Sequence, residues 1–540
     1  MKNRWVRILL MLWCATVTAQ TLSDRQIHYR PGDWISYPVL RYVNAVTLDQ
    51  QTIYFGTTGG ILQYKFYENL WDAPITVSDG LASGPVTALI FDDNTSRLWA
   101  VAGNRLCYRE PSSENWYVFT NLGSMPITDL GAGGKFMWII KSGEYWKMDR
   151  FALTLQQSAR EESLLDQVQW GDKRYTYDEE NPEFYFIDPP YQWFPEGYVQ
   201  DVQFRQYEIT NTVPDDFSNL WVGSRGLGGG VVELFTRSLK FMPFGIWSPD
   251  VRTMAWDEKG LWIGGASDPG GTGGISYWNL DTDEWEYFEA PFIPHLYSHE
   301  INAIETTKDL VWFGTRQGLT RLGRNTKNWR TWTVHDGLWS DVINTLAITD
   351  GLLWIGTPLG INRFYMEGEF IEQVREKPLI HRTIFHLEAD GQDLWAATDQ
   401  GLFHYSAEQR EWRIESGYGG LLYQDVWSVS ATDKDVWVAT DDGVMMLDKT
   451  TGKWEGFPMS QHFDYDVFHH ILADRKAVWV ATENGALKYN KEETRWRRFT
   501  TEDGLLDNHV QWLMLEGSYI WFATPKGMTR FFWNAPYRID

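Results

Sequence analysis

One short phrase recurs along the whole chain and limits what the chain can fold into. It joins an apolar and an aromatic residue to a small residue, Thr and a later Gly, as in LWIGTPLGINRF at 353–364 and VWVATENGALKY at 478–489. The aromatic residue serves as an anchor, and eleven copies have one: Tyr54, Trp99, Trp138, Trp221, Trp262, Trp312, Trp354, Trp395, Trp437, Trp479 and Trp521. From Trp312 onward the anchors lie 42, 41, 42, 42 and 42 residues apart. Such a fixed period is typical of repeat architectures.

Each repeat divides into four strand-like segments. A second aromatic landmark follows the anchor by 17 residues in six copies: Trp71, Trp116, Trp329, Trp412, Trp454 and Trp496. Aromatic residues make up 16% of the chain, which favours strands. Four short strands per repeat, closed by DG or GG turns, are typical of a β-propeller blade. The predicted fold class is therefore all-β, a β-propeller of four-stranded blades.

The number of blades predicts two tandem propellers. The gap of 83 residues between Trp138 and Trp221 predicts a twelfth, degenerate copy around 184–186. Twelve blades exceed the roughly four to eight of a single ring. We place the boundary in the insertion-rich stretch after Trp262, with a propeller of about six blades at 20–295 and another of about six at 296–540. Five plus seven blades, or one large ring, are alternatives.

Several repeat residues are expected to be architectural. The small residue two places after the anchor is predicted to leave space for an aromatic side chain of the adjacent blade. A Gly stands six places after the anchor in seven copies, where a tight hairpin requires a positive φ: Gly60, Gly318, Gly360, Gly401, Gly443, Gly485 and Gly527.

The two ends of the chain are expected to share a blade. After Trp521 no outer-strand Trp follows, and the segment 33–37 (DWISY) resembles that missing strand. We predict that it completes the last blade and closes a ring, which also removes an open sheet edge.

The N-terminus and the charge bear on location and partners. Lys2, Arg4 and Arg7 precede an apolar run at 8–13 and small residues ending at Ala19, the layout of a cleaved signal peptide over 1–19. Cys14 leaves a lipoprotein signal as an unfavoured alternative. We expect a periplasmic or extracellular protein, with no membrane span after signal removal and, with Cys107 as its single remaining cysteine, no internal disulfide. A net charge of −24 argues against nucleic-acid binding.

The candidate ligand-binding residues lie on loops predicted to meet at one propeller face. Positions just before the inner strands are expected to circle the mouth of the central channel, and nearby aromatic and basic side chains suit stacking on sugar rings. The candidates are Glu300, Asp341, Asp425, Asp466, His509, Trp339, Arg382, Tyr418 and Tyr423. A cation such as Ca²⁺ or a polyhydroxylated ligand fits such a mouth. The alternative is that these residues cap turns and face water.

Motifs for catalysis are nearly absent. The sequence has no GxSxG elbow, no Walker phosphate loop and no HExxH, and His469-His470 lies in an inner-strand segment where packing is expected. We expect no enzyme and no cofactor, Ca²⁺ excepted. Carboxylates from separate loops still leave a lyase or glycosidase open.

The repeats resemble those of the two-component regulator propeller family. The similarity rests on HDGLWSDVINTLAITDGLLWIGTPLGINRF at 335–364 and TEDGLLDNHVQWLMLEGSYIWFATPKGMTRF at 501–531. It implies the periplasmic sensor half of bacterial hybrid two-component regulators, with tandem propellers and glycan sensing. In that family a membrane helix, a kinase and further domains follow. The printed sequence ends at its last repeat, so we expect that it does not signal by itself.

A second, weaker similarity concerns the opening of the chain. The stretch from GDWISYP through IYFGTTGGILQY to SDGLASGPVTALIFD is similar to the propeller component of the type IX secretion machinery. Three functions therefore remain open. The first is a non-enzymatic propeller that binds an oligosaccharide or a partner protein. The second is an accessory subunit of an envelope secretion or sensing assembly, and the third is a carbohydrate-active enzyme.

Overall fold

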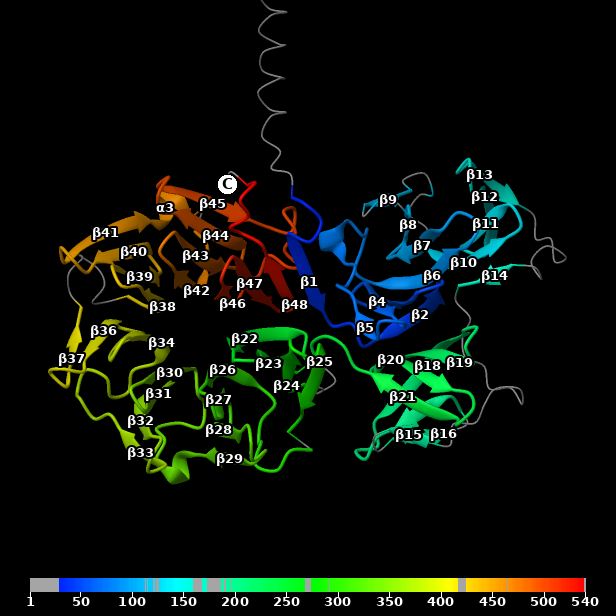
Figure 1. The fold of residues 1–540 in the computed structure, drawn as a ribbon. Helices are drawn as coiled ribbons and strands as arrows, with labels where there is room; N and C mark the ends of the chain where they lie inside the picture. The colour runs from blue at the N-terminus through cyan, green and yellow to red at the C-terminus, as the bar shows by residue number, and fades with distance from the viewer. Residues whose placement is uncertain are drawn as a thin grey trace, which may run out of the picture.

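The fold is almost entirely β-structure (Figure 1). The computed structural model describes residues 29–538 except 112, 114, 120–121, 123–125, 159–167, 172–185, 189–190, 195, 268–272, 291, 416–423 and 464. The predicted signal peptide lies outside the described residues. Within the described residues, three short helices interrupt the strands: η1 (Val77–Asp79), η2 (Val334–Asp336) and α3 (Met459–His462). The described part of the chain contains no helix long and apolar enough to cross a membrane.

The first four sheets come from the N-terminal half. The first sheet holds β2 (Val43–Leu48), β3 (Thr52–Thr57), β4 (Ile61–Lys65) and β5 (Leu70–Trp71). The second holds β6 (Val86–Asp92), β7 (Arg97–Ala102), β8 (Arg105–Arg109) and β9 (Trp116–Val118). The third holds β10 (Ile127–Gly133), β11 (Phe136–Lys141), β12 (Glu144–Asp149), β13 (Leu155–Ser158) and, beside β10, β14 (Gln169–Trp170). The fourth holds β15 (Phe186–Asp188), β16 (Gln192–Phe194), β17 (Tyr198–Gln200), β18 (Gln206–Pro214), β19 (Asn219–Ser224), β20 (Gly228–Glu233) and β21 (Ser238–Met242).

Seven further four-stranded sheets follow in chain order. The first holds β22 (Asp250–Trp256), β23 (Gly260–Ala266), β24 (Ile275–Asn279) and β25 (Glu284–Phe288). The second holds β26 (Ile301–Thr306), β27 (Leu310–Thr315), β28 (Gly318–Gly323) and β29 (Trp329–Trp332). The third holds β30 (Thr345–Thr349), β31 (Leu352–Thr357), β32 (Gly360–Tyr365) and β33 (Phe370–Gln373). The fourth holds β34 (Ile384–Asp390), β35 (Asp393–Thr398), β36 (Gly401–Ser406) and β37 (Glu411–Ile414). The fifth holds β38 (Val426–Ala431), β39 (Asp435–Thr440), β40 (Gly443–Asp448) and β41 (Lys453–Pro458). The sixth holds β42 (Phe468–Ala473), β43 (Ala477–Thr482), β44 (Gly485–Asn490) and β45 (Arg495–Phe499). The last is β46 (Trp512–Glu516), β47 (Tyr519–Thr524), β48 (Gly527–Phe531) and β1 (Trp34–Pro38).

These seven sheets form a closed ring, which we call the seven-sheet ring. Each inner strand contacts the next from β22 to β46, and β46 and β47 contact β22 in turn (Figure 1). The boundary predicted between 295 and 296 falls between β25 and β26, which belong to adjoining sheets of this ring. The sheet that begins at Asp250 contacts the last sheet of the chain through β22 and β46, and the division of the blades between two propellers stays a prediction.

The first four sheets pack side by side, and the count of twelve blades is not confirmed. The inner strands β18, β2, β6 and β10 contact one another in that order. The degenerate copy predicted around 184–186 lies largely outside the described residues. Its last residue, Phe186, begins β15, which pairs in parallel with β21 as an edge of the fourth sheet. The described chain thus has eleven sheets, one for each anchor, and the five-plus-seven division stays a prediction.

The terminal strand pairs as predicted. β1 runs antiparallel to β48, with Trp34 opposite Phe531 and Pro38 opposite Gly527. Trp34 is almost fully buried and packs with Phe499 and Phe522 of the neighbouring strands. The outer strand of the last sheet is therefore the first strand of the chain.

The repeat residues have identifiable structural roles. All eleven anchors lie buried in the strand that pairs with the inner strand of their sheet, and the seven hairpin glycines have positive φ values, such as 133° at Gly443. The Thr before each of these hairpins donates its hydroxyl to the glycine carbonyl, at 3.0 Å for Thr440 and Gly443.

The space beside the small residue is filled differently from the prediction. A Cβ at Gly314 would lie 2.7 Å from Ile343 Cγ2, and one at Gly356 would lie 2.8 Å from Ile384 Cγ2. A branched aliphatic residue of the next inner strand fills the space, and the predicted aromatic residue is wrong. The branched side chain fits because the two inner strands approach closely there.

The two groups of sheets share a hydrophobic core. Phe244, which follows β21, packs on Trp71 of the first sheet and on Trp285 of the seven-sheet ring, with ring centroids 5.1 and 5.7 Å apart. Tyr287 donates its hydroxyl to the Gly245 carbonyl at 2.9 Å.

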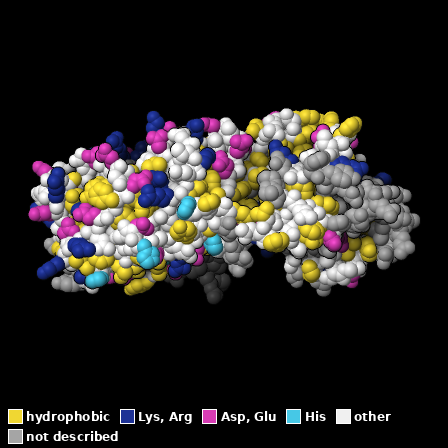
Figure 2. Space-filling model, turned by 90° about the horizontal axis from the view of Figure 1, so that it is seen from below, with side chains coloured by type: hydrophobic (Ala, Val, Ile, Leu, Met, Phe, Trp, Pro, Cys, Tyr) yellow, Lys and Arg dark blue, Asp and Glu magenta, His cyan; other side chains and the backbone are white. Residues whose placement is uncertain are grey.

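On the face seen from below, acidic and basic side chains are interspersed over the described atoms (Figure 2).

Candidate functional site

The predicted mouth residues stand before the inner strands of the seven-sheet ring, as the repeat pattern requires. Glu300 directly precedes β26, Asp425 precedes β38, and Asp466 lies two residues before β42. The two candidates Tyr418 and Tyr423 lie outside the described residues. The other seven differ in how far the protein itself already satisfies their polar groups.

Glu300 belongs to a chain of ion pairs at the edge of the mouth. Its carboxylate lies 3.2 Å from the guanidinium of Arg316 and 3.5 Å from that of Arg252. Arg252 also pairs with Asp250 at 3.0 Å, and Gln511 donates to the other oxygen of Asp250 at 2.6 Å. This chain links the first, second and last sheets of the ring, so Glu300 has a structural role there.

Asp341 and Asp466 are also satisfied from within the protein. Asp341 Oδ1 accepts the Val334 N–H at 2.7 Å at the start of η2. The Asp466 carboxylate is 1% exposed and bonds Arg498 at 2.6 Å and the Asn484 amide at 2.8 Å. Because the Asp466 carboxylate is buried and held by two donors, it fixes the loops that it joins. It has no exposed surface that a ligand could contact.

Trp339, Arg382 and His509 lie at the loops where they were predicted. Trp339 meets His381 edge to face at 6.2 Å, and Arg382 Nε donates to the Pro378 carbonyl at 3.3 Å. His509 stacks on His469, with centroids 4.9 Å apart. These contacts order the mouth.

Asp425 is the predicted residue whose surroundings favour a ligand. Burial raises the pKa of its carboxyl, and the charges of Asp441 and Asp399 raise that pKa further. Trp427, two residues on, donates its indole N–H to Asp441 Oδ1 at 2.8 Å and packs on Phe385, with centroids 4.7 Å apart. We call these five residues the acidic aromatic cluster; both of its aromatic side chains are partly exposed. Asp399 Oδ1 is buried and has no hydrogen-bond partner among the described residues.

Below the mouth, aromatic side chains meet across the ring axis. His470 stacks on Trp512 with centroids 3.7 Å apart, and His386 meets both rings at 5.0 and 5.6 Å. These residues come from β34, β42 and β46. Burial lowers the pKa of His386 to about 4 and that of His470 well below its ordinary value, so both are neutral at pH 7. His470 packs in the ring, as predicted.

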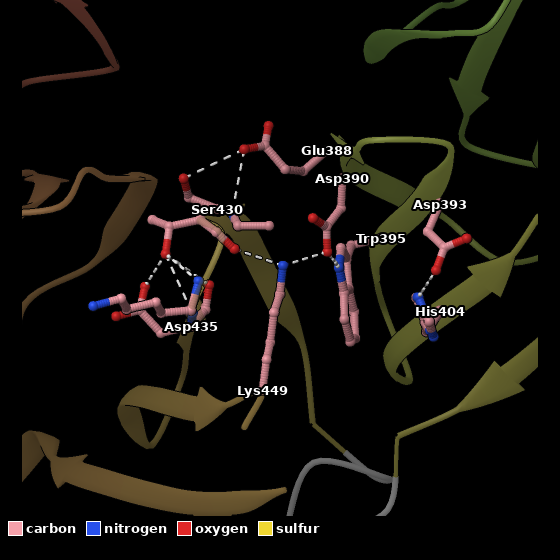
Figure 3. A network of polar contacts seen from close by, with 11 residues as sticks. Glu388, Asp390, Asp393, Trp395, His404, Ser430, Asp435 and Lys449 are labelled. Atoms are coloured by element: carbon pink, nitrogen blue, oxygen red, sulfur yellow. Dashed lines mark hydrogen bonds and ion pairs between the residues drawn. The ribbon is translucent and has the colours of Figure 1, made fainter. Parts of the chain in front are cut away.

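Two buried carboxyl groups lie on inner strands of the same ring. Burial raises the pKa of Glu305 on β26 to about 8, and the charge of Glu388 on β34 contributes to that rise. Burial also raises the pKa of Glu388 to about 7, although Ser430 Oγ and the Ala431 N–H lie 3.4 and 3.3 Å from its Oε1. Figure 3 shows this contact with β38. At neutral pH Glu305 is therefore largely protonated, and Glu388 is about half protonated.

The same view shows how neighbouring sheets are joined. Asp390, at the end of β34, bonds the Trp395 indole at 3.0 Å and the Lys449 ammonium at 2.5 Å (Figure 3). Lys449 belongs to the next sheet and also donates to the Thr432 carbonyl at 2.6 Å. These charges are paired and act as structural links.

Asp425 is the candidate of the acidic aromatic cluster that the sequence analysis names, and the two aromatic residues of the cluster escaped it. Phe385 and Trp427 are the second residues of their inner strands, where two other repeats have Asn302 and Asn344. Those asparagines donate to the carbonyls of the next inner strand. An aromatic residue in place of such an asparagine was the available signal.

Metal ligation has no support from side-chain grouping. Across the described residues, no group of three or more His, Cys, Asp or Glu side chains is placed to hold a metal ion. Ca²⁺ at the mouth stays a prediction.

Comparison with known proteins gives similarity of fold. No protein-family model matches the chain, and no curated protein sequence matches it. Among solved structures, the extracellular domain of the hybrid two-component system BT4673 from B. thetaiotaomicron is 14% identical, with 91% of this chain and 70% of that chain covered and a TM-score of 0.44. PorZ of the type IX secretion system of Porphyromonas gingivalis is 14% identical, with 91% and 73% covered and a TM-score of 0.46. A virginiamycin B lyase from Staphylococcus aureus is 13% identical, with 52% and 94% covered and a TM-score of 0.41. The first two are the kinds of protein that the repeats resemble.

Proposed function

We propose that this chain is an exported, non-enzymatic β-propeller protein that binds a ligand at the mouth of the seven-sheet ring, as a relative of periplasmic sensor propellers. The acidic aromatic cluster carries the proposal. Its two partly exposed rings offer an aromatic surface, and its three carboxylates offer acceptors near that surface. Rings beside acceptors suit a polyhydroxylated ligand such as an oligosaccharide.

A thermal-shift screen tests this function directly. Residues 20–540 are heated with a panel of neutral oligosaccharides, each with and without CaCl₂. A ligand present at about 100 times its Kd adds about 2.7 kcal/mol to the free energy of unfolding, so a binder raises the Tm clearly. A rise that requires CaCl₂ supports a cation at the mouth, and a flat panel contradicts the oligosaccharide proposal.

Variants locate the site. Trp427→Ala is expected to abolish the shift, because it removes the ring on which the ligand stacks. Phe370→Ala is the matched control, since Phe370 is an aromatic residue that is 53% exposed on the outer strand β33 of the same ring. Equal loss in both variants places the binding elsewhere. Product formation from any saccharide, lost in Asp341→Ala or Asp425→Ala, favours the carbohydrate-active enzyme instead.

A second candidate function is that of an accessory subunit in an envelope secretion or sensing assembly. An exposed aromatic pair on the first group of sheets favours it: Tyr67 and Phe217 are 64% and 58% exposed, and their rings meet edge to face at 5.8 Å. Exposed aromatic patches often mark protein interfaces. Capture of a defined envelope protein by the wild type, and its loss in Tyr67→Ser with Phe217→Ser, supports this function.

A further inference from the structure

A cleft of about 1120 Å³ opens between the first two sheets and the meeting point of the chain ends. It exists because β5 has only two residues, after which the chain turns away through 72–79 into η1. Ser78 Oγ then donates to the Gly504 carbonyl at 2.8 Å and contacts Ser36 Oγ at 2.7 Å. These bonds fix the two walls relative to each other. The cleft is as large as the small-molecule sites of proteins, which span roughly 300–1,000 Å³.

Three acidic residues of the cleft have a basic partner. Asp72 pairs with Lys65 at 3.0 Å, and Glu110 pairs with Arg97 at 2.8 Å. Asp503 lies 3.3 Å from Arg497 and accepts the Tyr29 hydroxyl at 2.9 Å. The negative charge of these residues is therefore largely compensated within the protein.

Two further carboxyls are held by hydrogen bonds. Asp49 accepts the N–H groups of Gln51 and Thr52, both at 2.7 Å. Asp79 accepts the Thr76 N–H at 2.8 Å, and burial raises its pKa to about 6. Its charge is thus reduced in mildly acidic solution. Glu502 is the remaining acidic residue, and it is exposed at the edge.

Two arginines of the cleft are compensated less, although the charge of Arg109 lowers the pKa of Asp79. The Arg109 guanidinium, from β8, has one hydrogen bond, a long one of 3.4 Å to Gln63 Oε1, and lies 6.0 Å from the centre of the Trp116 ring. The Arg30 guanidinium, from the segment before β1, stacks 3.7 Å above the Tyr537 ring. Neither forms an ion pair with an acidic side chain of the described residues, in a chain where acidic residues outnumber basic ones by 72 to 48. A planar guanidinium with free donors is suited to bidentate binding of an oxyanion.

We propose that this cleft binds a ligand through an oxyanion group, a carboxylate or a sulfate, held chiefly by Arg109 and assisted by Arg30. The apolar edges of Tyr54 and Trp116, which line the same cleft, contact the body of the ligand. The site is separate from the mouth of the seven-sheet ring and does not depend on binding there.

Titration calorimetry of residues 20–540 tests the proposal with three probes. Trigalacturonate presents carboxylates, sulfated maltose presents sulfates, and maltotriose is the neutral control. At least one anionic probe is expected to bind at least tenfold more tightly than maltotriose, with an affinity that falls as NaCl is raised. Binding of one anion alone identifies the oxyanion. Binding of neither, or equal binding of maltotriose, overturns the proposal.

Two variants distinguish the cleft from general charge effects. Arg109→Gln is expected to weaken the anionic probe at least tenfold, with an unchanged Tm as the check on folding. Arg105→Gln is the matched control, because Arg105 lies on the same strand, is exposed and does not line the cleft. Equal effects of both variants overturn the proposal, whereas Trp427→Ala should leave this binding unchanged. Because Asp79 is protonated below about pH 6, anion affinity should also be higher at pH 5.5 than at pH 7.5.

Discussion

Trp34 stacks face to face on Phe531, with ring centroids 3.8 Å apart and planes 10° from parallel, although the two residues come from opposite ends of the chain. The Trp34 side chain fills the space between the last two sheets. It lies so close to Gly504 that a Cβ at this position would be 2.6 Å from the Trp34 ring. The last sheet therefore depends on a residue that is synthesised with the first.

Trp34→Ala should reduce the free energy of unfolding by about 3–5 kcal/mol, the usual cost of emptying a buried Trp site. Urea denaturation of residues 20–540 measures it. Phe235→Ala is the control, since Phe235 is 93% exposed, and should change stability by less than about 0.5 kcal/mol. Deletion of 20–40 should lower the Tm further, and an unchanged Tm would show that β1 does not close the ring.

Gly443→Val should destabilise the protein by about 3 kcal/mol. A side chain is strained at φ 133°, and the new Cβ would lie 2.2 Å from the Phe457 carbonyl oxygen. Asp442→Ala, at the exposed neighbouring position, should be nearly neutral. Thermal melts of the two variants compare them, and similar losses would contradict the structural role of the hairpin glycine.

The carboxyls at the ring axis should make stability fall as pH rises. Glu305 has a pKa of about 8 in the folded protein and an ordinary pKa near 4.5 when unfolded, so between these values only the folded state holds the proton. The free energy of unfolding then decreases with rising pH. Glu305→Gln removes the contribution of Glu305 to this dependence, and the free energy of unfolding of this variant relative to the wild type should increase by on the order of 1–2 kcal/mol from pH 6.5 to 8.5. Urea melts at both pH values measure the difference, and parallel curves would contradict it. His386, whose pKa is about 4 in the folded protein, is present in both proteins, so its titration in the unfolded state cancels from this difference.

Removal of the charge should affect the free energy of unfolding differently at Asp466 and at Asp425. Asp466→Ala leaves Arg498 and Asn484 without their buried partner and should cost about 1–3 kcal/mol. Asp425→Asn relieves repulsion from Asp399 and Asp441, so stability should stay equal or rise. Chemical denaturation distinguishes them, and a loss in Asp425→Asn as large as that in Asp466→Ala would refute the difference in role.

The fold was largely predictable from the sequence, because a residue buried in every repeat leaves a periodic record. The anchors and the hairpin glycines recur at fixed spacing, and each marks the same place in its sheet. The division between the two groups of sheets left no such record. It depends on whether the sheet that begins at Asp250 packs on β46, a contact between distant segments.

The candidate site was predictable only in part, for a related reason. The loop positions of Asp425 and Asp466 look alike in the sequence, yet one carboxylate faces other acids and the other faces Arg498 from an adjacent hairpin. Phe385 and Trp427 were missed because an aromatic residue is ordinary in a chain with 31 Trp. The cleft between sheets comes from the shortness of β5 and from Tyr29 to Ile35, and no motif describes it.

The pairing of β1 with β48 sets an order of events during folding. The N-terminal strand leaves the ribosome first, but its partner emerges last, so the first strand stays unpaired while the other ten described sheets form. Such distant pairing slows folding and prolongs the exposure of apolar residues such as Trp34. A circular permutant that begins at residue 39 and carries 29–38 after residue 538 makes the same contacts locally. It should refold faster than the natural order while reaching the same native structure.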